Sequence, residues 1–155
     1  MEFGEDLIKE FLEHKEANPN TFTWWSFVNI KSDLQTALGF AKFFYPEIIE
    51  VNGCFLLKDK YDEQRFQSWK DACNNSKKCI ERMMNLYELA DFFHINTTFD
   101  EGDDIQGQVK ALGEALKLFW SMSFRDRFPE RQIVVDIFVE YDDQLFITVY
   151  EELNK

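Results

Sequence analysis

Two strand-turn-strand patterns, separated by helical sequence, constrain the fold of this chain most. In the first, the apolar runs 48–51 and 54–57 flank Asn52-Gly53. Both turn residues tolerate the positive φ angles that a two-residue hairpin requires. In the second, residues 132–139 and 145–151 alternate or run apolar around a four-residue loop at 141–144. The sequence therefore predicts two antiparallel hairpins far apart in the chain.

The rest of the chain carries mostly helical patterns. Apolar residues recur at helical spacing in five segments, which are 3–16, 34–44, 61–73, 76–94 and 103–124. Ser32 with Gln35, and Asp103 with Gln106, have the spacing of capping boxes and predict two helix starts. Residues 22–27 contain four aromatics but no clear period, so either an irregular segment or a short helix fits them.

The order of these elements predicts the fold class. The strands are segregated and show no β-α-β alternation, which favours an α+β protein over a parallel α/β one. We expect a mostly antiparallel sheet of about four strands from the two hairpins, with about five helices packed on it. The length of 155 residues fits a single α+β domain over 1–155, and 45% hydrophobic residues suffice for one core.

The charge balance restricts the partners. The chain has 29 acidic and 17 basic residues, a formal net charge of −12. Such a negative field repels phosphate backbones and attracts basic proteins, so we expect a basic protein partner and no nucleic acid. The first residues contain no basic region and no continuous apolar stretch, so we expect no membrane contact and a cytoplasmic location.

The three cysteines, Cys54, Cys73 and Cys79, suggest reduced thiols. Their number is odd and no pair has C-x-x-C spacing, a pattern that fits a reducing compartment better than a disulfide framework. We expect all three to be small buried apolar groups. Cys54, directly after the hairpin glycine, is the most interesting thiol, but its strand position argues against reactivity.

No motif in the sequence carries recognisable catalytic chemistry. The patterns G-x-S-x-G, G-x-G-x-x-G and the P-loop are absent. His14 and His94 lack neighbours at zinc-site spacing, and the acidic run 100–104 lacks the ligand spacing of an EF-hand. We therefore expect no catalytic residues, no metal and no cofactor, which favours a non-enzymatic protein although distant residues can still meet in a fold.

The closing hairpin offers the most suggestive surface. Alternation places one row of aliphatic residues on the core face and a mixture of aromatic and acidic residues on the other face. The second face suits either covering helices or the surface of a partner protein. The predicted partner-binding residues on this face and in its loop are Asp136, Phe138, Glu140, Asp142, Asp143, Phe146 and Tyr150.

Three short stretches carry a resemblance. They are Ala41-Lys42-Phe43-Phe44-Tyr45-Pro46-Glu47, Glu50-Val51-Asn52-Gly53-Cys54 and Arg127-Phe128-Pro129-Glu130-Arg131. The chain resembles, in these stretches, a group of small uncharacterised bacterial cytosolic proteins. The resemblance implies a bacterial cytosolic protein and supplies no activity.

The leading functional hypothesis is a non-enzymatic acidic binding protein, specifically an immunity-type inhibitor of a toxin or effector. Aromatic side chains are the anchors that protein interfaces prefer. The alternative is a small-molecule-binding domain or an unrecognised enzyme, with Trp24 and Trp25 lining an apolar pocket and Arg125 fixing an anion. A nucleic-acid mimic and a symmetric homodimer also fit the charge and the apolar hairpin face.

Overall fold

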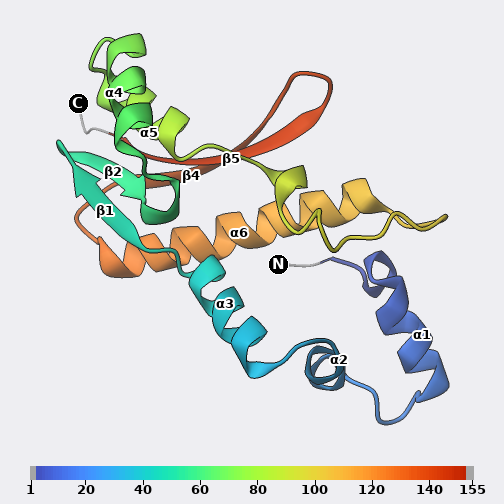
Figure 1. Cartoon of the computed structure of the whole chain (residues 1–155). Helices are drawn as coiled ribbons and strands as arrows, with labels where there is room; N and C mark the ends of the chain where they lie inside the picture. Colours follow the sequence, from blue (N-terminus) through green and yellow to red (C-terminus); the bar gives the residue numbers. More distant parts are fainter. Residues whose placement is uncertain (1–2, 153–155) are drawn as a thin grey trace.

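A computed structural model describes residues 3–152 of the chain (Figure 1). These residues form an α+β protein, as the sequence predicts. The elements, in chain order, are η1 (Glu5–Leu7), α1 (Lys9–Ala17), α2 (Trp24–Lys31), α3 (Leu34–Phe44), β1 (Ile48–Val51), β2 (Cys54–Leu57), η2 (Lys58–Lys60), α4 (Glu63–Ala72), α5 (Lys77–Met84), β3 (Tyr87–Glu88), η3 (Leu89–Asp91), α6 (Ile105–Arg127), β4 (Ile133–Glu140) and β5 (Gln144–Glu151), where η marks a 3-10 helix.

The strands form two antiparallel sheets. β1 and β2 make the predicted hairpin, with Val51 opposite Cys54 and positive φ angles at Asn52 and Gly53. The second sheet has the order β3-β5-β4, and β4 pairs with β5 along its whole length. The loop of this hairpin is one residue shorter than expected, because Gln144 pairs with Glu140.

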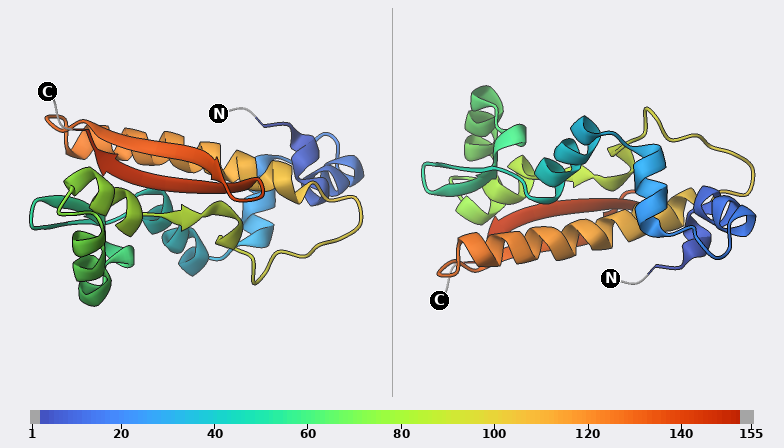
Figure 2. Two further views of the ribbon diagram at one scale, coloured as in Figure 1. Left: turned by 90° about the horizontal axis from the view of Figure 1, so that it is seen from above. Right: turned by 90° about the horizontal axis from the view of Figure 1, so that it is seen from below.

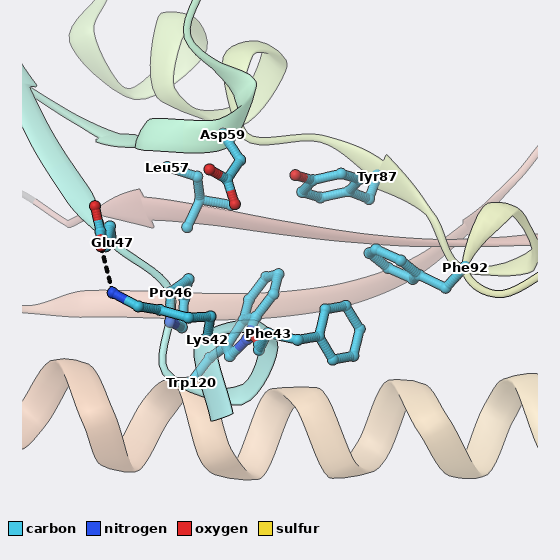
Figure 3. Close-up of a pocket in the computed structure, with 9 residues that line it drawn as sticks. All are labelled: Lys42, Phe43, Pro46, Glu47, Leu57, Asp59, Tyr87, Phe92 and Trp120. Atoms are coloured by element: carbon cyan, nitrogen blue, oxygen red, sulfur yellow. Dashed lines mark hydrogen bonds and ion pairs between the residues drawn. The ribbon is translucent and has the colours of Figure 1, made fainter. Parts of the chain in front are cut away.

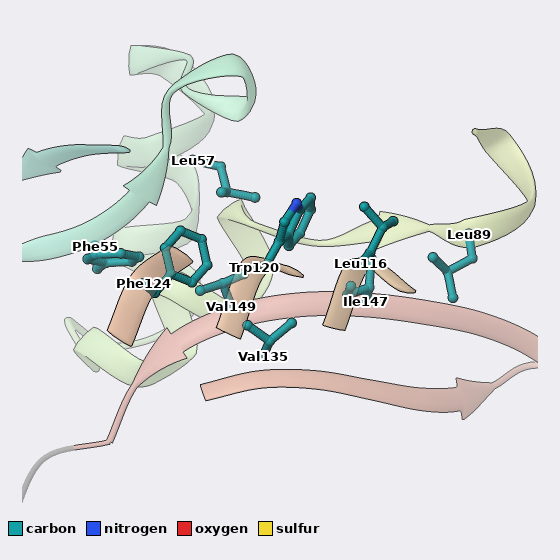
Figure 4. Close-up of a cluster of buried hydrophobic side chains, with 9 residues drawn as sticks. All are labelled: Phe55, Leu57, Leu89, Leu116, Trp120, Phe124, Val135, Ile147 and Val149. Carbon is teal, nitrogen blue, oxygen red and sulfur yellow. The ribbon is translucent and has the colours of Figure 1, made fainter. Parts of the chain in front are cut away.

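The long helix α6 covers one face of the larger sheet. Both views in Figure 2 show β4 and β5 running along this helix. Leu116, Trp120 and Phe124 of α6 belong to the same buried cluster as Val135 of β4 and Val149 of β5 (Figure 4). Burial of these side chains is the main source of stability in this layer.

Helix α5 occupies the opposite face near the end of β5. The hydroxyl of Thr148 donates a hydrogen bond to the Arg82 carbonyl, at 2.7 Å. Apolar residues of α5, including Ile80 and Met84, form a second buried cluster with Leu56 and with Phe66 of α4. The sheet is therefore covered on both faces at this end.

Two buried side chains, Glu81 of α5 and Asn85 directly after it, join the two sheets. Asn85, directly after the last turn, accepts a hydrogen bond from the Leu57 amide and donates to the carbonyls of Phe55 and Val149, each at 2.8 Å. The carboxylate of Glu81 accepts hydrogen bonds from the amides of Phe55 and Glu151, both at 2.7 Å. β2 and β5 belong to different sheets and are not paired with each other, so these two side chains supply the hydrogen bonds that connect them.

The helical boundaries differ from the sequence expectation in two places, and a third segment that the sequence left open is settled. The segment 76–94 is not one helix, because α5 ends at Met84 and the chain then pairs as β3 and turns as η3. The segment 3–16 is interrupted at Ile8, whose φ and ψ of −119° and 78° are not helical. The open segment 22–27 contains the start of α2, capped by Thr23 and Ser26.

Two helix caps also lie one residue later than expected. Asp33, and not Ser32, accepts the hydrogen bond from the Thr36 amide at the start of α3. Asp104, and not Asp103, accepts the corresponding bond from Gly107 at the start of α6. A carboxylate in the N-cap position satisfies an otherwise unpaired amide and faces the positive end of the helix dipole.

The expectation of three reduced cysteines is wrong, because Cys73 and Cys79 form a disulfide with a Cα–Cα distance of 5.7 Å. Cys73 ends α4, and the positive φ angles of Asn74 and Asn75 reverse the chain so that α5 returns alongside it. The spacing of the cysteines does not indicate this pair, since the chain reversal between them depends on two asparagines in the left-handed region. Cys54 is a free, buried thiol, as expected.

None of the helices described between residues 3 and 152 combines the length and apolar character that crossing a bilayer requires.

Candidate functional site

The hairpin face predicted to bind a partner is partly covered by its own chain. Tyr150 is buried, whereas Phe138 and Phe146 are half-buried and stack on each other with ring centroids 5.9 Å apart. The guanidinium of Arg82 lies over the rings of Phe138 and Tyr150, 5.4 and 5.2 Å from their centroids, and 3.8 Å from the Asp136 carboxylate. Helix α5 thus covers this face of the hairpin at the Tyr150 end, and the face becomes more exposed towards the loop.

The loop end of this hairpin is the exposed part. Glu140, Asp142 and Asp143 are all exposed, and Tyr141 between them is 79% exposed. Tyr141, Asp142 and Asp143 have φ angles of 42°, 50° and 66°. Left-handed backbone costs an L-residue about 1–2 kcal/mol, so the loop stores strain of the kind often found at functional sites. Sequence reasoning singled out the acids here but missed Tyr141, which its loop position between acids could have indicated.

The three residues of the predicted small-molecule site do not converge. Trp24 stacks on Phe11, with ring centroids 3.7 Å apart, and Trp25 beside it is 74% exposed. Arg125 lies near the other end of the molecule, on the last turns of α6 beside Asp126. Of the five pockets described between residues 3 and 152, one is lined by Arg125 and none by a tryptophan of α2.

An aromatic groove lies elsewhere, between α6 and the N-terminal helices. Its volume is about 670 Å³, and its walls come from η1, α2, α3, residues 92–97 and the first two thirds of α6. Phenylalanine rings dominate these walls and include Phe3, Phe27, Phe40, Phe44, Phe93 and Phe119. Figure 1 shows α1, α2 and α3 on the side of α6 opposite β4 and β5. We call this feature the apolar groove.

The rings of the apolar groove contact one another but stay accessible. Phe44 and Phe119 meet edge to face at 5.1 Å between centroids, which joins α3 to α6. Phe93 contacts Phe40 at 5.7 Å and has a positive φ of 62°. Phe40, Phe93 and Phe119 each leave more than a third of their surface exposed. An apolar ligand could therefore bury ring surface that the chain itself leaves in water.

A second hollow of about 510 Å³ continues the apolar groove and is acidic. The two hollows share Ile8, Thr97 and Gln108. The second is also lined by four carboxylates and one lysine, which are Glu10, Glu13, Asp100, Asp103 and Lys9. We call it the acidic mouth. The side-chain amide of Gln108 donates a hydrogen bond to the Leu7 carbonyl at 2.8 Å and fastens the N-terminal segment to α6 where the hollows meet.

Most carboxylates of the acidic mouth have no cationic partner. Glu10 pairs with Lys31. Within the part of the chain that the structure describes, Glu13, Asp100 and Asp103 form no ion pair. The mouth consequently presents net negative charge at the end of an apolar surface.

Helices α2 and α3 expose a further apolar surface. No residue of either helix is buried. Trp25, Val28, Leu34 and Leu38 are more than half exposed, with Leu34 at 84% and Leu38 at 69%. We call these four residues the α2–α3 apolar surface. It adjoins the apolar groove because Phe27 and Phe40 of the same helices line that groove.

A small cavity beside the α3–β1 junction has a structural role (Figure 3). It holds about 40 Å³, room for water but far below the size of ligand pockets. The Trp120 indole donates to the Phe43 carbonyl at 2.9 Å beside it. Lys42 and Lys58 hold the pKa of Glu47 down to about 2, and burial raises the pKa of Tyr87 to about 12. These contacts tie α3 to β1 and to the core.

No arrangement for metal or nucleophilic chemistry stands out. The residues that the structure describes contain no cluster of three His, Cys, Asp or Glu suited to a metal ion. Burial raises the pKa of the Cys54 thiol, which disfavours the reactive thiolate. The Nδ1 atom of His14, near the end of α1, lies 2.8 Å from the Glu10 carbonyl, and that of His94, in the turn after η3, lies 2.6 Å from the Asp91 carbonyl, so both rings make local backbone contacts.

Comparison with known proteins adds no assignment, because a scan against family models and searches of curated proteins and of solved structures found no match.

Proposed function

We propose that this chain is a non-enzymatic binding protein that holds a basic protein, as an immunity-type inhibitor holds a toxin or effector. The observation that supports it best is the α2–α3 apolar surface, four large side chains left in water by helices with no buried residue. Exposed apolar patches of this kind mark interaction sites, and aromatic residues are preferred anchors at such sites.

Charge supports the basic character of the partner. The chain has a formal net charge of −12, and its exposed hairpin loop and acidic mouth concentrate carboxylates. A field of one sign accelerates association with a partner of the opposite sign and loses this effect as salt increases. In this proposal, acids steer the partner and the apolar surface holds it.

The first test is recovery of a partner by the tagged protein from cells, at low salt. The comparison is between the native chain and a variant carrying Leu34→Ser and Leu38→Ser, since both side chains are exposed and their loss should not disturb the core. A matched variant on the same helix carries Gln35→Ser and Ala41→Ser, also at exposed positions.

We expect the leucine variant to lose a basic partner that the matched variant retains, and the purified pair to associate more slowly as salt rises. Failure of the native chain to recover any basic protein would count against the proposal. The competing possibility is that a second copy of this chain covers the α2–α3 apolar surface. Sedimentation of the purified chain tests it, because the native chain would then be a dimer and the leucine variant a monomer.

A bacterial origin and a cytoplasmic location are part of the same proposal. The Cys73–Cys79 disulfide provides their sharpest test, since such bonds persist mainly in oxidising compartments. Alkylation of thiols at the moment of lysis distinguishes the reduced form of this cysteine pair from the disulfide-bonded form. Reduced Cys73 and Cys79 would support the cytoplasmic location, and oxidised ones would contradict it.

The apolar groove favours a second candidate, the binding of a small apolar molecule. Its volume of about 670 Å³ falls within the range of about 300–1,000 Å³ that ligand pockets occupy. Native mass spectrometry of the chain purified without organic solvent tests this function. A co-purifying ligand of constant mass would support it, and a spectrum of bare chain would not.

A further inference from the structure

We propose that the apolar groove and the acidic mouth together bind a cationic amphipathic α-helix of the partner protein. This inference rests on the proposed protein-binding function and names the site and the chemistry of the bound segment. It follows from three properties of the two hollows, namely length, charge and the kind of backbone that lines them.

The first property is length. Ile105 and Phe119, at the two ends of the α6 wall, are 14 positions apart in one uninterrupted helix. At a rise of 1.5 Å per residue, this wall extends about 21 Å. A bound helix of about 14 residues has the same length, spans about four turns and presents about six to eight apolar side chains on one face. The rings of Phe40, Phe93 and Phe119 would cover those side chains.

The second property is charge. The groove is apolar, whereas the mouth that continues it at Ile8 and Gln108 carries Glu13, Asp100 and Asp103 without ion-pair partners among residues 3–152. A ligand that matches both surfaces is apolar along one side and positively charged at one end or along its other side. Anionic amphiphiles, including fatty acids, match the groove but are repelled by the mouth.

The third property is the backbone of the walls. The described walls come from helices, from η1 with the flanking residues Phe3 and Ile8, and from the turn segment 92–97, and no strand edge lines the apolar groove. An extended peptide binds best by adding a strand to a sheet edge, where its amides find partners. A helix satisfies its own backbone and needs only an apolar groove, so it is the peptide conformation that these walls favour.

The experiment measures binding of designed fluorescent peptides of about 14 residues to the full chain by anisotropy. The test peptide is an amphipathic helix with Leu and Phe on one face and Lys on the other. One control has the same composition scrambled, so that the faces disappear, and another carries Glu in place of Lys. We expect only the test peptide to bind, with affinity falling about tenfold or more between about 50 and about 200 mM salt.

Two protein variants locate the site. Ala111→Trp places a large ring into the apolar groove from a half-exposed position of α6, and Ser121→Trp places the same ring on α6 outside it. We expect Ala111→Trp to weaken binding of the test peptide about tenfold or more, and Ser121→Trp to leave it unchanged. Thermal unfolding of both variants verifies that each remains folded.

Two charge variants of equal net charge test the mouth. The mouth variant carries Glu13→Gln, Asp100→Asn and Asp103→Asn. The control carries three substitutions at exposed acids far from it in sequence, Asp71→Asn, Asp126→Asn and Glu130→Gln. At low salt we expect the mouth variant to bind the test peptide about tenfold more weakly, and the control variant to bind it like the native chain.

The outcomes separate this inference from the proposed function. Binding that Ala111→Trp and the mouth variant leave unchanged overturns the inference. So does a chain that recovers its basic partner from cells but binds no cationic helix, although the proposed function then stands. Displacement of the test peptide by a long-chain alkyl amine that itself binds more tightly would overturn the choice of a helix in favour of a small cationic amphiphile.

Discussion

At the scale of single residues, Glu81 and Asn85 decide how the two sheets sit together. Both are fully buried polar groups, and their five hydrogen bonds all go to backbone atoms of β2 and β5. Buried polar groups are tolerated when every partner is present and become costly when one is removed. Burial raises the pKa of Glu81, while its two backbone donors and Lys77 act in the opposite direction.

The first prediction concerns Asn85. Replacing Asn85→Ala leaves the Leu57 amide and the carbonyls of Phe55 and Val149 without this partner. Because each buried group without a partner costs about 1–3 kcal/mol, we expect the free energy of unfolding to fall by about 3 kcal/mol or more. Urea unfolding measures it. Asn96→Ala, at an exposed position, should change it by less than about 0.5 kcal/mol, and equal effects would contradict the bridging role.

The second prediction concerns pH. Arg131 donates two hydrogen bonds to Glu151, at 2.9 and 2.6 Å, and together with Lys77 it lowers the pKa of this carboxyl from 4.5 to about 2. Because the pKa of Glu151 is lower in the folded state than in the unfolded state, its ionisation stabilises the fold at any pH above the unfolded pKa. This stabilisation is lost as pH falls from about 4.5 towards about 2.

Arg131→Gln should therefore unfold more easily than the native chain at pH 7, by about 1–2 kcal/mol, and the difference should shrink near pH 3. The raised pKa of Glu81 works in the opposite sense, since it reduces stability as pH rises above the ordinary value. That effect is common to both proteins and cancels in the comparison. Urea unfolding at several pH values measures the difference, and a difference independent of pH would contradict the assignment to Glu151.

At the scale of elements, local sequence signals predict turns and helix ends correctly where one or two residues dictate the backbone conformation. The Asn52-Gly53 hairpin is confirmed in its exact register because both residues adopt the left-handed angles that the turn requires. The end of α3 at Phe44, before Pro46, is confirmed for a similar reason. By contrast, the apolar period of 76–94 continues past Met84, although tertiary pairing with β5 turns that part into β3.

The third prediction compares two glycines. Gly53 has a φ of +77°, so a Cβ there is strained although no atom lies within 4 Å of it. Gly39, inside α3, also has open space around its Cβ position and needs no special angle. We expect Gly53→Ala to destabilise the fold by about 1–2 kcal/mol and Gly39→Ala to stabilise it by about 0.5–1 kcal/mol. Thermal unfolding of both variants checks the opposite signs, and a shift of the same sign in both would refute this explanation.

At the scale of the whole molecule, the N-terminal helices are the least buried part. Between η1 and α3 the only fully buried residue is Phe11, whereas α6 and β5 contribute most of the larger core cluster. Phe11 packs against Phe22, Trp24 and Phe27, so α1 and α2 hold mainly to each other. The N-terminal wall of the apolar groove, formed by η1, α2 and α3, is therefore attached to the core chiefly through Phe43 and Phe44 of α3.

The fourth prediction follows from this uneven burial. Amide hydrogen exchange should be faster in α1 and α2 than in α6 and β5, because segments with few buried contacts open locally at lower cost. Exchange followed by mass spectrometry measures the protection of each segment. The disulfide-linked α4–α5 segment serves as an internal reference of similar helical length. Uniform protection across the chain would contradict a loosely attached N-terminal wall.

The sequence by itself determined the fold class, both hairpins, most helices and the negative charge. These properties depend on local backbone preferences and on composition, which a linear pattern contains. The disulfide, the strand β3, the bridge through Glu81 and Asn85, and the apolar groove with its acidic mouth were decided only by the tertiary structure. Each joins residues far apart in the chain or depends on a reversal at one or two residues, so no periodicity indicates it.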